Sequence, residues 1–169
     1  PGFNDAHTHF LATTLFTAGA FDVYGANSLQ DVQNILRTYS QQHPDFEWLI
    51  GWRWNNSMLG NDCWPSYADL DVAENQRPVA IIDIDGHSCW VNSRTLEKVG
   101  YDRNTPDPLG GKILRDSQGS PTGILFEKAY EDVIPRCEKV DAAQIPSLIR
   151  DGVARLNRLG LTSLSNNGV

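Results

Sequence analysis

Segments typical of strands alternate with segments typical of helices along this chain, and this alternation constrains the fold more than any other feature. The strand-like segments are short, apolar and rich in β-branched or aromatic residues, at 1–11, 47–54, 79–85 and 161–165. The helix-like segments repeat apolar residues at three- and four-residue spacing, at 29–43, 92–100 and 145–159. This order predicts an α/β protein in which helices cover a parallel sheet.

Capping residues mark the expected helix ends. Ser28 and Asp31 form an S-x-x-D capping pattern before the first helix, which should end near His43 because the residue before a proline resists helical torsions. Start signals also precede the other two helices, namely Asn92 or Ser93, and the D-x-x-Q pair Asp141 and Gln144. Glycines are expected to end these two helices, Gly100 and Gly160.

The region 102–127 interrupts the alternation. It is rich in proline, and two strand-like stretches, 111–116 and 121–127, flank a polar turn as in a β-hairpin. We therefore expect a hairpin excursion near 102–127 from a single domain that spans 1–169. The remaining elements amount to about four βα units, which predicts a partial TIM (β/α)8 barrel. A flavodoxin-like open sheet produces a similar pattern.

Composition excludes several classes of partner. The net charge of -7 and the pI near 4.9 argue against binding to nucleic acid or to an anionic membrane surface. The uncharged run 6–21 is too short to span a bilayer, which needs about 20 apolar residues. The three cysteines, Cys63, Cys89 and Cys137, are odd in number and form no C-x-x-C pair. Reduced thiols and a cytoplasmic location are the resulting predictions.

The first strand carries a potential metal site. Asp5, His7 and His9 alternate along it, so their side chains point to one face with neighbours about 7 Å apart at Cα. Two imidazoles at this spacing can bind one cation, and zinc needs three or four ligands in total. The alternative is that the two histidines simply make ordinary hydrogen bonds in a loop.

The opening PGFNDAHTHF resembles the P-G-h-x-D-x-H-x-H start of the metal-dependent amidohydrolases. Longer stretches, 77–100, 105–129 and 159–169, are similar in order to the subgroup that includes N-substituted formamide deformylase and the YtcJ-like proteins. The resemblance covers nearly the whole chain. It implies the N-terminal part of a larger catalytic barrel.

The resemblance also implies roles for individual residues. His7 and His9 match the metal-binding pair of the family, whose cofactor would be a divalent metal, most commonly zinc. Glu127 resembles the glutamate of a P-T-G-h-h-x-E-x-A pattern and could reach the metal, although a solvated glutamate at a helix start is the simpler interpretation. The remaining ligands of the family would lie beyond Val169. Asp5 is expected to orient one ligand imidazole.

Candidate substrate-binding residues follow the strongest predicted strand. Asp85 and His87 belong to the sequence DGHS, and His87 could hydrogen-bond a substrate carbonyl or instead cap the next helix. Trp90 is a candidate wall of the substrate pocket. Trp52 and Trp54 lie two apart, as a stacking platform requires, but burial in the core is the more common role of tryptophan.

The expected activity is hydrolysis of amide-type, non-peptide C–N bonds of a small molecule through a metal-activated water. The alternative is a non-catalytic, truncated or degenerate module that acts in binding or self-assembly. Two observations favour this alternative. The ligand set is incomplete, and Ser165 and Asn166 stand where the subgroup usually has T-S-V-H-D. We expect the chain to self-associate because half a barrel exposes strand edges.

Overall fold

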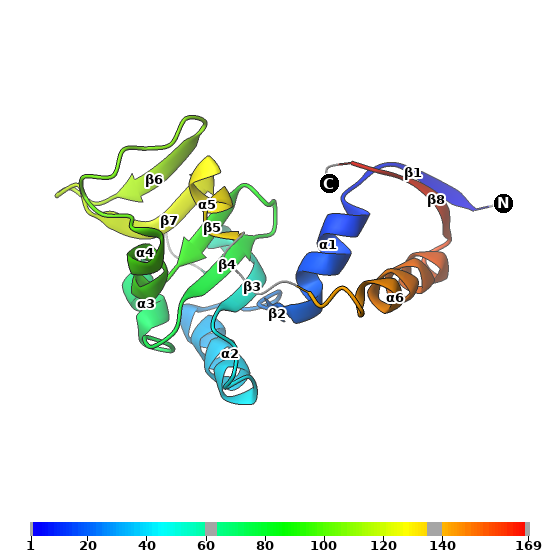
Figure 1. Cartoon of the computed structure of the whole chain (residues 1–169), viewed down its shortest axis with the longest axis horizontal. Coiled ribbons are helices and arrows are strands. Elements are labelled where there is room, and N and C mark those ends of the chain that lie inside the picture. Colours follow the sequence, from blue (N-terminus) through cyan, green and yellow to red (C-terminus); the bar gives the residue numbers. More distant parts are fainter. Residues whose placement is uncertain (1, 60–63, 135–139, 168–169) are drawn as a thin grey trace. The chain divides into compact units, whose positions relative to one another are not determined.

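The computed structural model describes residues 2–59, 64–134 and 140–167. Contacts group the chain into two compact units (Figure 1). Unit 1 combines the two ends of the chain, Pro1–Ala20 and Lys139–Val169, and unit 2 is the intervening stretch, Phe21–Glu138. In the sequence, unit 2 lies between the two segments of unit 1, and the single domain expected over 1–169 stays a prediction.

Unit 1 is built on one pair of parallel strands. β1 (Phe3–Thr8) pairs with β8 (Leu161–Asn166), from Phe3 opposite Leu161 to Thr8 opposite Asn166. Its helices are α1 (Phe10–Phe16), the short 3-10 turn η1 (Thr17–Gly19) and α6 (Ile145–Arg158). Gly152 of α6 lets the ring of Phe10 approach closely, since a Cβ at this position would lie 2.9 Å from that ring.

Unit 2 contains a six-stranded sheet in the order β2-β3-β4-β5-β7-β6. Its strands are β2 (Phe21–Asp22), β3 (Leu49–Trp54), β4 (Val79–Asp83), β5 (Ser88–Val91), β6 (Gly111–Arg115) and β7 (Pro121–Glu127). β2, β3 and β4 run parallel, and the other neighbours pair antiparallel. The predicted hairpin is confirmed, but β7 joins the main sheet through β5, so the hairpin extends the sheet.

Local capping chemistry explains the helices of unit 2. These are α2 (Leu29–Gln42), α3 (Tyr67–Asp71), α4 (Ser93–Val99), α5 (Lys128–Glu131) and the 3-10 turn η2 (Asn56–Leu59). The Ser28 hydroxyl accepts a hydrogen bond from the Asp31 amide at 3.2 Å, as the capping pattern predicted. Asn92 caps α4, and Gly100 ends it in the left-handed region with φ 80°.

Some local predictions were wrong. Gln144 stands at the N-cap of α6 without a side-chain cap, and Asp141 accepts from the Ala143 amide in a turn before the helix. Several short elements were not predicted, among them α1, α3, β2 and β5. Each is at most seven residues long, which is too short for a clear periodic pattern.

The partial TIM barrel is not confirmed. The described strands do not form four successive βα units. The first and last expected strands pair with each other, while 47–54 and 79–85 belong to the separate sheet of unit 2. That sheet is mixed, because the six residues 86–91, not assigned from the sequence, contain β5 and turn the chain back on itself. The result is a mixed α/β protein.

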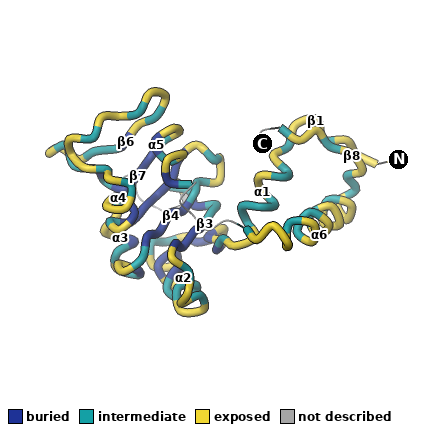
Figure 2. Tube along the Cα trace, viewed as in Figure 1, coloured by how far each residue is buried: buried dark blue, intermediate teal, exposed yellow. Residues whose placement is uncertain are grey.

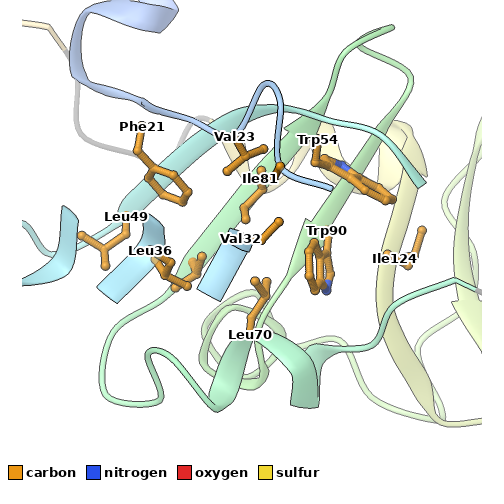
Figure 3. Packing of buried hydrophobic residues seen from close by; sticks show 12 residues of the cluster. Phe21, Val23, Val32, Leu36, Leu49, Trp54, Leu70, Ile81, Trp90 and Ile124 are labelled. Atoms are coloured by element: carbon orange, nitrogen blue, oxygen red, sulfur yellow. The ribbon is translucent and has the colours of Figure 1, made fainter. Parts of the chain in front are cut away.

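The core lies in unit 2. Apolar side chains of the sheet meet those of α2 and α3 in one cluster, which includes Phe21, Val32, Leu36, Leu49, Leu70, Ile81, Trp90 and Ile124 (Figure 3). Most residues of strands β3, β4, β5 and β7 are buried, and dark blue stretches mark the sheet of unit 2 in Figure 2. By contrast, no described residue of unit 1 is buried. None of the described helices is long and apolar enough to cross a membrane.

Asn92 joins several segments of unit 2 through one buried amide. Its Oδ1 accepts from the backbone amides of Val79 and Thr95, both at 3.0 Å. Its Nδ2 donates to the carbonyl oxygens of Glu74 and Arg77, both at 2.9 Å. The side chain therefore anchors the start of β4, the preceding turn and the first turn of α4.

We expect Asn92→Ala to lower the free energy of unfolding by about 2 to 4 kcal/mol, because it removes a helix cap and leaves buried backbone groups without partners. Urea unfolding followed by tryptophan fluorescence measures this. The matched control is Asn104→Ala at an exposed position, which should change stability by less than about 0.5 kcal/mol. Equal effects of the two substitutions would contradict the anchoring role of Asn92.

Candidate functional site

The two histidines of the opening motif lie together at the carboxyl end of β1. His7 is in the strand, and His9 stands at the N-cap of α1. Their ring centroids are 5.4 Å apart and the rings meet edge to face at 74°. Both side chains are exposed. The pair is therefore accessible at a strand end, as the sequence predicted.

Asp5 contacts this pair through the backbone. Its Oδ1 accepts a hydrogen bond from the amide of His7 at 3.0 Å, which shapes the strand end. The expected contact with an imidazole is not among the described hydrogen bonds, so that role of Asp5 stays a prediction.

The end of β8 supports the same region. Asn166 Oδ1 accepts from the amide of Leu11 at 2.9 Å, and the Thr8 carbonyl accepts from the amide of Asn167 at 2.7 Å. Because the His9 side chain makes no cap, Asn166 supplies this hydrogen bond to the first turn of α1. Asn166 is one of the positions where the sequence departs from its subgroup. Its hydrogen bond to Leu11 joins residues 155 positions apart, so the sequence alone did not indicate this structural role.

The donors near β1 fit part of a divalent metal site. Imidazole nitrogen is a good ligand for zinc and several other divalent metals. Two neighbouring rings can supply two ligands, whereas a structural or catalytic zinc needs three or four in total. Among the described residues no group of three or more His, Cys, Asp or Glu side chains could hold a metal. His7 and His9 are therefore an incomplete ligand set.

A second polar region lies along one edge of the sheet in unit 2. The parallel strands β2, β3 and β4 end at this edge, and β7 ends there too, because it runs antiparallel to β5 and β5 antiparallel to β4. The edge therefore collects residues from distant parts of the sequence, namely Asp22, Arg53, Asp83, Asp85, His87 and Glu127.

His87 and Glu127, predicted separately, form a pair at this edge. His87 Nδ1 lies 3.0 Å from Glu127 Oε1, and the backbone amide of Glu127 donates to the carbonyl of His87 at 3.1 Å. Asp85 Oδ1 accepts from the His87 amide at 2.8 Å. The Tyr130 hydroxyl donates to the Gly86 carbonyl and holds the same turn. His87 does not cap α4, since β5 and Asn92 intervene.

Burial alters the acidity of two groups beside this pair. Burial raises the pKa of Asp83, and the nearby charge of Asp85 acts in the same direction. Asp83 accepts from the Ser88 hydroxyl at 3.1 Å and from the Asp85 amide at 3.3 Å. Burial also raises the pKa of Tyr130, with Cys89 and Glu127 adding to the effect. Asp83, Ser88 and Tyr130 were not predicted as site residues, although Asp83 lies two residues before Asp85.

Two non-glycine residues among those described have positive φ, and both lie at this edge: Arg53 at 65° and Glu127 at 50°. Arg53 forms an ion pair with Asp22, and its guanidinium lies 4.3 Å from the centroid of the Tyr24 ring. Burial alone would raise the pKa of Asp22, but hydrogen bonds from Arg53 and Tyr24 outweigh it and lower that pKa. Strained backbone of this kind is concentrated at functional sites in proteins.

The tryptophans do not form the expected stacking platform. A register shift between Trp52 and Trp54 breaks the strand alternation, so Trp54 is buried in the core while Trp52 lies 4.8 Å from the Arg53 guanidinium. Trp90 is fully buried, and its indole N–H donates to the Ser66 carbonyl at 2.8 Å. The ring of Trp90 packs in the core, and no described contact links it to His87.

Known proteins are similar to this chain over most of its length. The chain is 32% identical over 162 residues to the putative amidohydrolase YtcJ of Bacillus subtilis, which covers 96% of this chain and 30% of that protein. It is 33% identical over 131 residues to N-substituted formamide deformylase of Arthrobacter pascens, covering 76% and 24% of the two chains.

A solved structure is also similar. This is an uncharacterized metal-dependent hydrolase from Pyrococcus horikoshii, with a TM-score of 0.58 and 25% identity over 97% of this chain and 30% of that one. The chain thus spans about a third or less of these three proteins. The model of the amidohydrolase family matches residues 1–168, and this chain therefore belongs to the amidohydrolase family, in its YtcJ-like subgroup.

Proposed function

We propose that this chain is part of a metal-dependent hydrolase that cleaves amide-type, non-peptide C–N bonds of small molecules, and that His7 and His9 hold its metal. The observation that carries the proposal is the pair of exposed imidazoles, 5.4 Å apart, at the carboxyl end of β1 in a chain of this family. Zinc suits such ligands. The remaining ligands would come from outside the described residues.

The residues of unit 1 have defined tasks under this proposal. A bound divalent metal would supply an activated water and polarise the substrate carbonyl. His7 and His9 would bind it through ring nitrogens. Asp5 would keep the backbone of His7 in position through its 3.0 Å hydrogen bond, and Asn166 would hold the start of α1 directly after His9.

The polar edge of unit 2 is proposed to contact substrate. His87 is 67% exposed, and its Nε2 can donate to a carbonyl when it carries a hydrogen, while Glu127 contacts the ring at Nδ1. Asp85 fixes the turn that presents His87. The strained backbone of Glu127 supports a role other than stability. A metal-ligand role for Glu127, a pocket role for Trp90 and a cytoplasmic location remain predictions, as does the exclusion of nucleic acid and membranes as partners.

A second candidate, self-assembly, is favoured by one observation. No described residue of unit 1 is buried, and large apolar side chains there are exposed, with Phe3 at 73% and Leu159 at 66%. Burial of such surface is favourable by about 25 cal/mol per Å². We therefore propose that the 169-residue chain by itself is inactive and associates through unit 1.

We expect His7→Ala and His9→Ala, each made in the full parent protein, to weaken zinc binding by more than about 100-fold, since even groups that only support a ligand contribute about 10 to 100-fold. Plasma mass spectrometry of the purified proteins after dialysis measures the bound metal. His43→Ala is the control, because the His43 ring packs 4.3 Å from Tyr39 in unit 2. Unchanged metal content and unchanged hydrolysis in both variants would refute the proposal.

Glu127→Gly should raise the free energy of unfolding by about 1 kcal/mol, because relief of about 1 to 3 kcal/mol of backbone strain exceeds the entropic cost of a glycine. Chemical denaturation measures the change. Glu131→Gly in α5 is the control and should destabilise by about 0.5 to 1 kcal/mol. A destabilising Glu127→Gly would show that the carboxylate is needed for folding.

The 169-residue chain should form dimers or larger species in light scattering. Leu159→Ser should weaken this association by exposing less apolar surface, with Leu109→Ser, fully exposed in unit 2, as the control. A monomer at every concentration would contradict association, and metal-dependent hydrolysis by this chain alone would contradict its inactivity.

A further inference from the structure

The His87 imidazole is engaged at one of its two ring nitrogens. Its Nδ1 lies 3.0 Å from Glu127 Oε1, and the side chains of the two residues are 67% and 52% exposed. An ionised carboxylate accepts hydrogen bonds and donates none, so the hydrogen of this contact belongs to Nδ1. A neutral ring carries a single hydrogen, and its second nitrogen, Nε2, is then a hydrogen-bond acceptor. Nε2 would donate only in the protonated ring.

The backbone that carries this ring is also fixed by hydrogen bonds. The amide of His87 donates to Asp85 Oδ1 at 2.8 Å, and the carbonyl of His87 accepts from the amide of Glu127 at 3.1 Å. The Tyr130 hydroxyl donates to the carbonyl of Gly86, directly before His87. A side chain binds a ligand selectively when its neighbours hold it in one orientation. The exposed imidazole meets this condition.

Glu127 contacts His87 from a strained backbone position. Its φ is 50°, in the left-handed region that residues other than glycine disfavour. Strain of this kind persists only where the surrounding structure fixes it, and it is concentrated at functional sites. An exposed pair of side chains contributes little to stability, so the contact with His87 is too weak to offset the strain. The geometry therefore supports a role of the ring other than stability.

The groups beside His87 that face solvent are hydrogen-bond acceptors. The carboxylates of Asp85 and Glu127 are exposed, like the ring itself. The neighbouring hydroxyl donors are engaged within the protein, since Tyr130 donates to a backbone carbonyl and Ser88 donates to a carboxylate at 3.1 Å. A ligand that suits this part of the polar edge is therefore a hydrogen-bond donor.

We propose that His87 is a specificity-determining residue that selects substrates with a hydrogen on the amide nitrogen. An amide of this kind has an acceptor, its carbonyl oxygen, and a donor, its N–H, and an acceptor at Nε2 pairs only with the N–H. A tertiary amide lacks this hydrogen and would leave Nε2 without a partner. Glu127 is the positioning residue, because it holds the ring hydrogen on Nδ1. The inference rests on the proposed hydrolase function and narrows its substrate class.

The position of the ring hydrogen can be measured directly. In the 169-residue chain with isotope-labelled histidine, long-range proton–nitrogen correlation spectra of the neutral ring should show the His87 hydrogen on Nδ1. Glu127→Gln should shift part of the population to Nε2–H, because a carboxamide can also donate to Nδ1. His43, whose ring packs 4.3 Å from that of Tyr39, is the internal reference and should not change.

Matched amides test the selection. The full parent protein is assayed with a panel of arylamides, each paired with its N-methyl derivative. We expect kcat/KM to be about tenfold higher for the N–H members, and His87→Ala should reduce this preference to about twofold. Glu127→Gln should reduce it to an intermediate value, and it tests the inference if His87→Ala does not fold. His43→Ala is the control and should keep the preference of the parent.

The outcomes separate this inference from the function on which it rests. A neutral His87 ring with its hydrogen on Nε2 would overturn the inference alone. Equal hydrolysis of the paired amides, or an undiminished preference in folded His87→Ala, would do the same. Hydrolysis of none of the pairs would count against the proposed function, and the inference would fall with it.

Discussion

The parallel pairing of β1 with β8 is the constraint on which the organisation of this chain depends. Parallel neighbours cannot be joined by a tight turn, so a long crossover must connect them. Here the crossover carries α1 and α6 and, between them, the whole of unit 2 with its own sheet and core. The same pairing brings the end of β8 to the start of α1, where Asn166 supports the turn that follows His9.

In unit 2, the polar groups that stabilise the fold and the exposed polar groups that could contact a substrate lie in different places. Asn92 is buried and uses both ends of its amide on backbone partners, as a purely structural residue does. By contrast, His87 and Glu127 lie at the strand ends of the polar edge, and both are exposed. Glu127 also has a strained backbone. The buried polar group that stabilises the fold thus lies within the sheet, and the exposed side chains that could bind a substrate lie at its edge. This division is common in proteins whose rigid scaffold presents functional loops.

Local chemistry made much of the fold predictable. The starts of α2 and α4 and the left-handed end at Gly100 followed from capping rules, because these interactions join residues within a few positions. The hairpin of β6 and β7 was also recognised. The pairing partners of the strands were not predicted. The segments of β3 and β4 were interpreted as barrel strands, and β5, which makes the sheet mixed, is too short to give a recognisable pattern.

The candidate site divides in the same way. The sequence by itself determined the family, and it placed the two histidines proposed as metal ligands together, because H-x-H brings two imidazoles to one strand end through local geometry alone. Only the tertiary structure decided that His87 meets Glu127 across forty residues, that Trp54 is buried while Trp52 is not, and that Trp54 packs edge to face against Trp64. Strand order, register and a single bulge set these contacts, and they depend on long-range packing that no local pattern encodes.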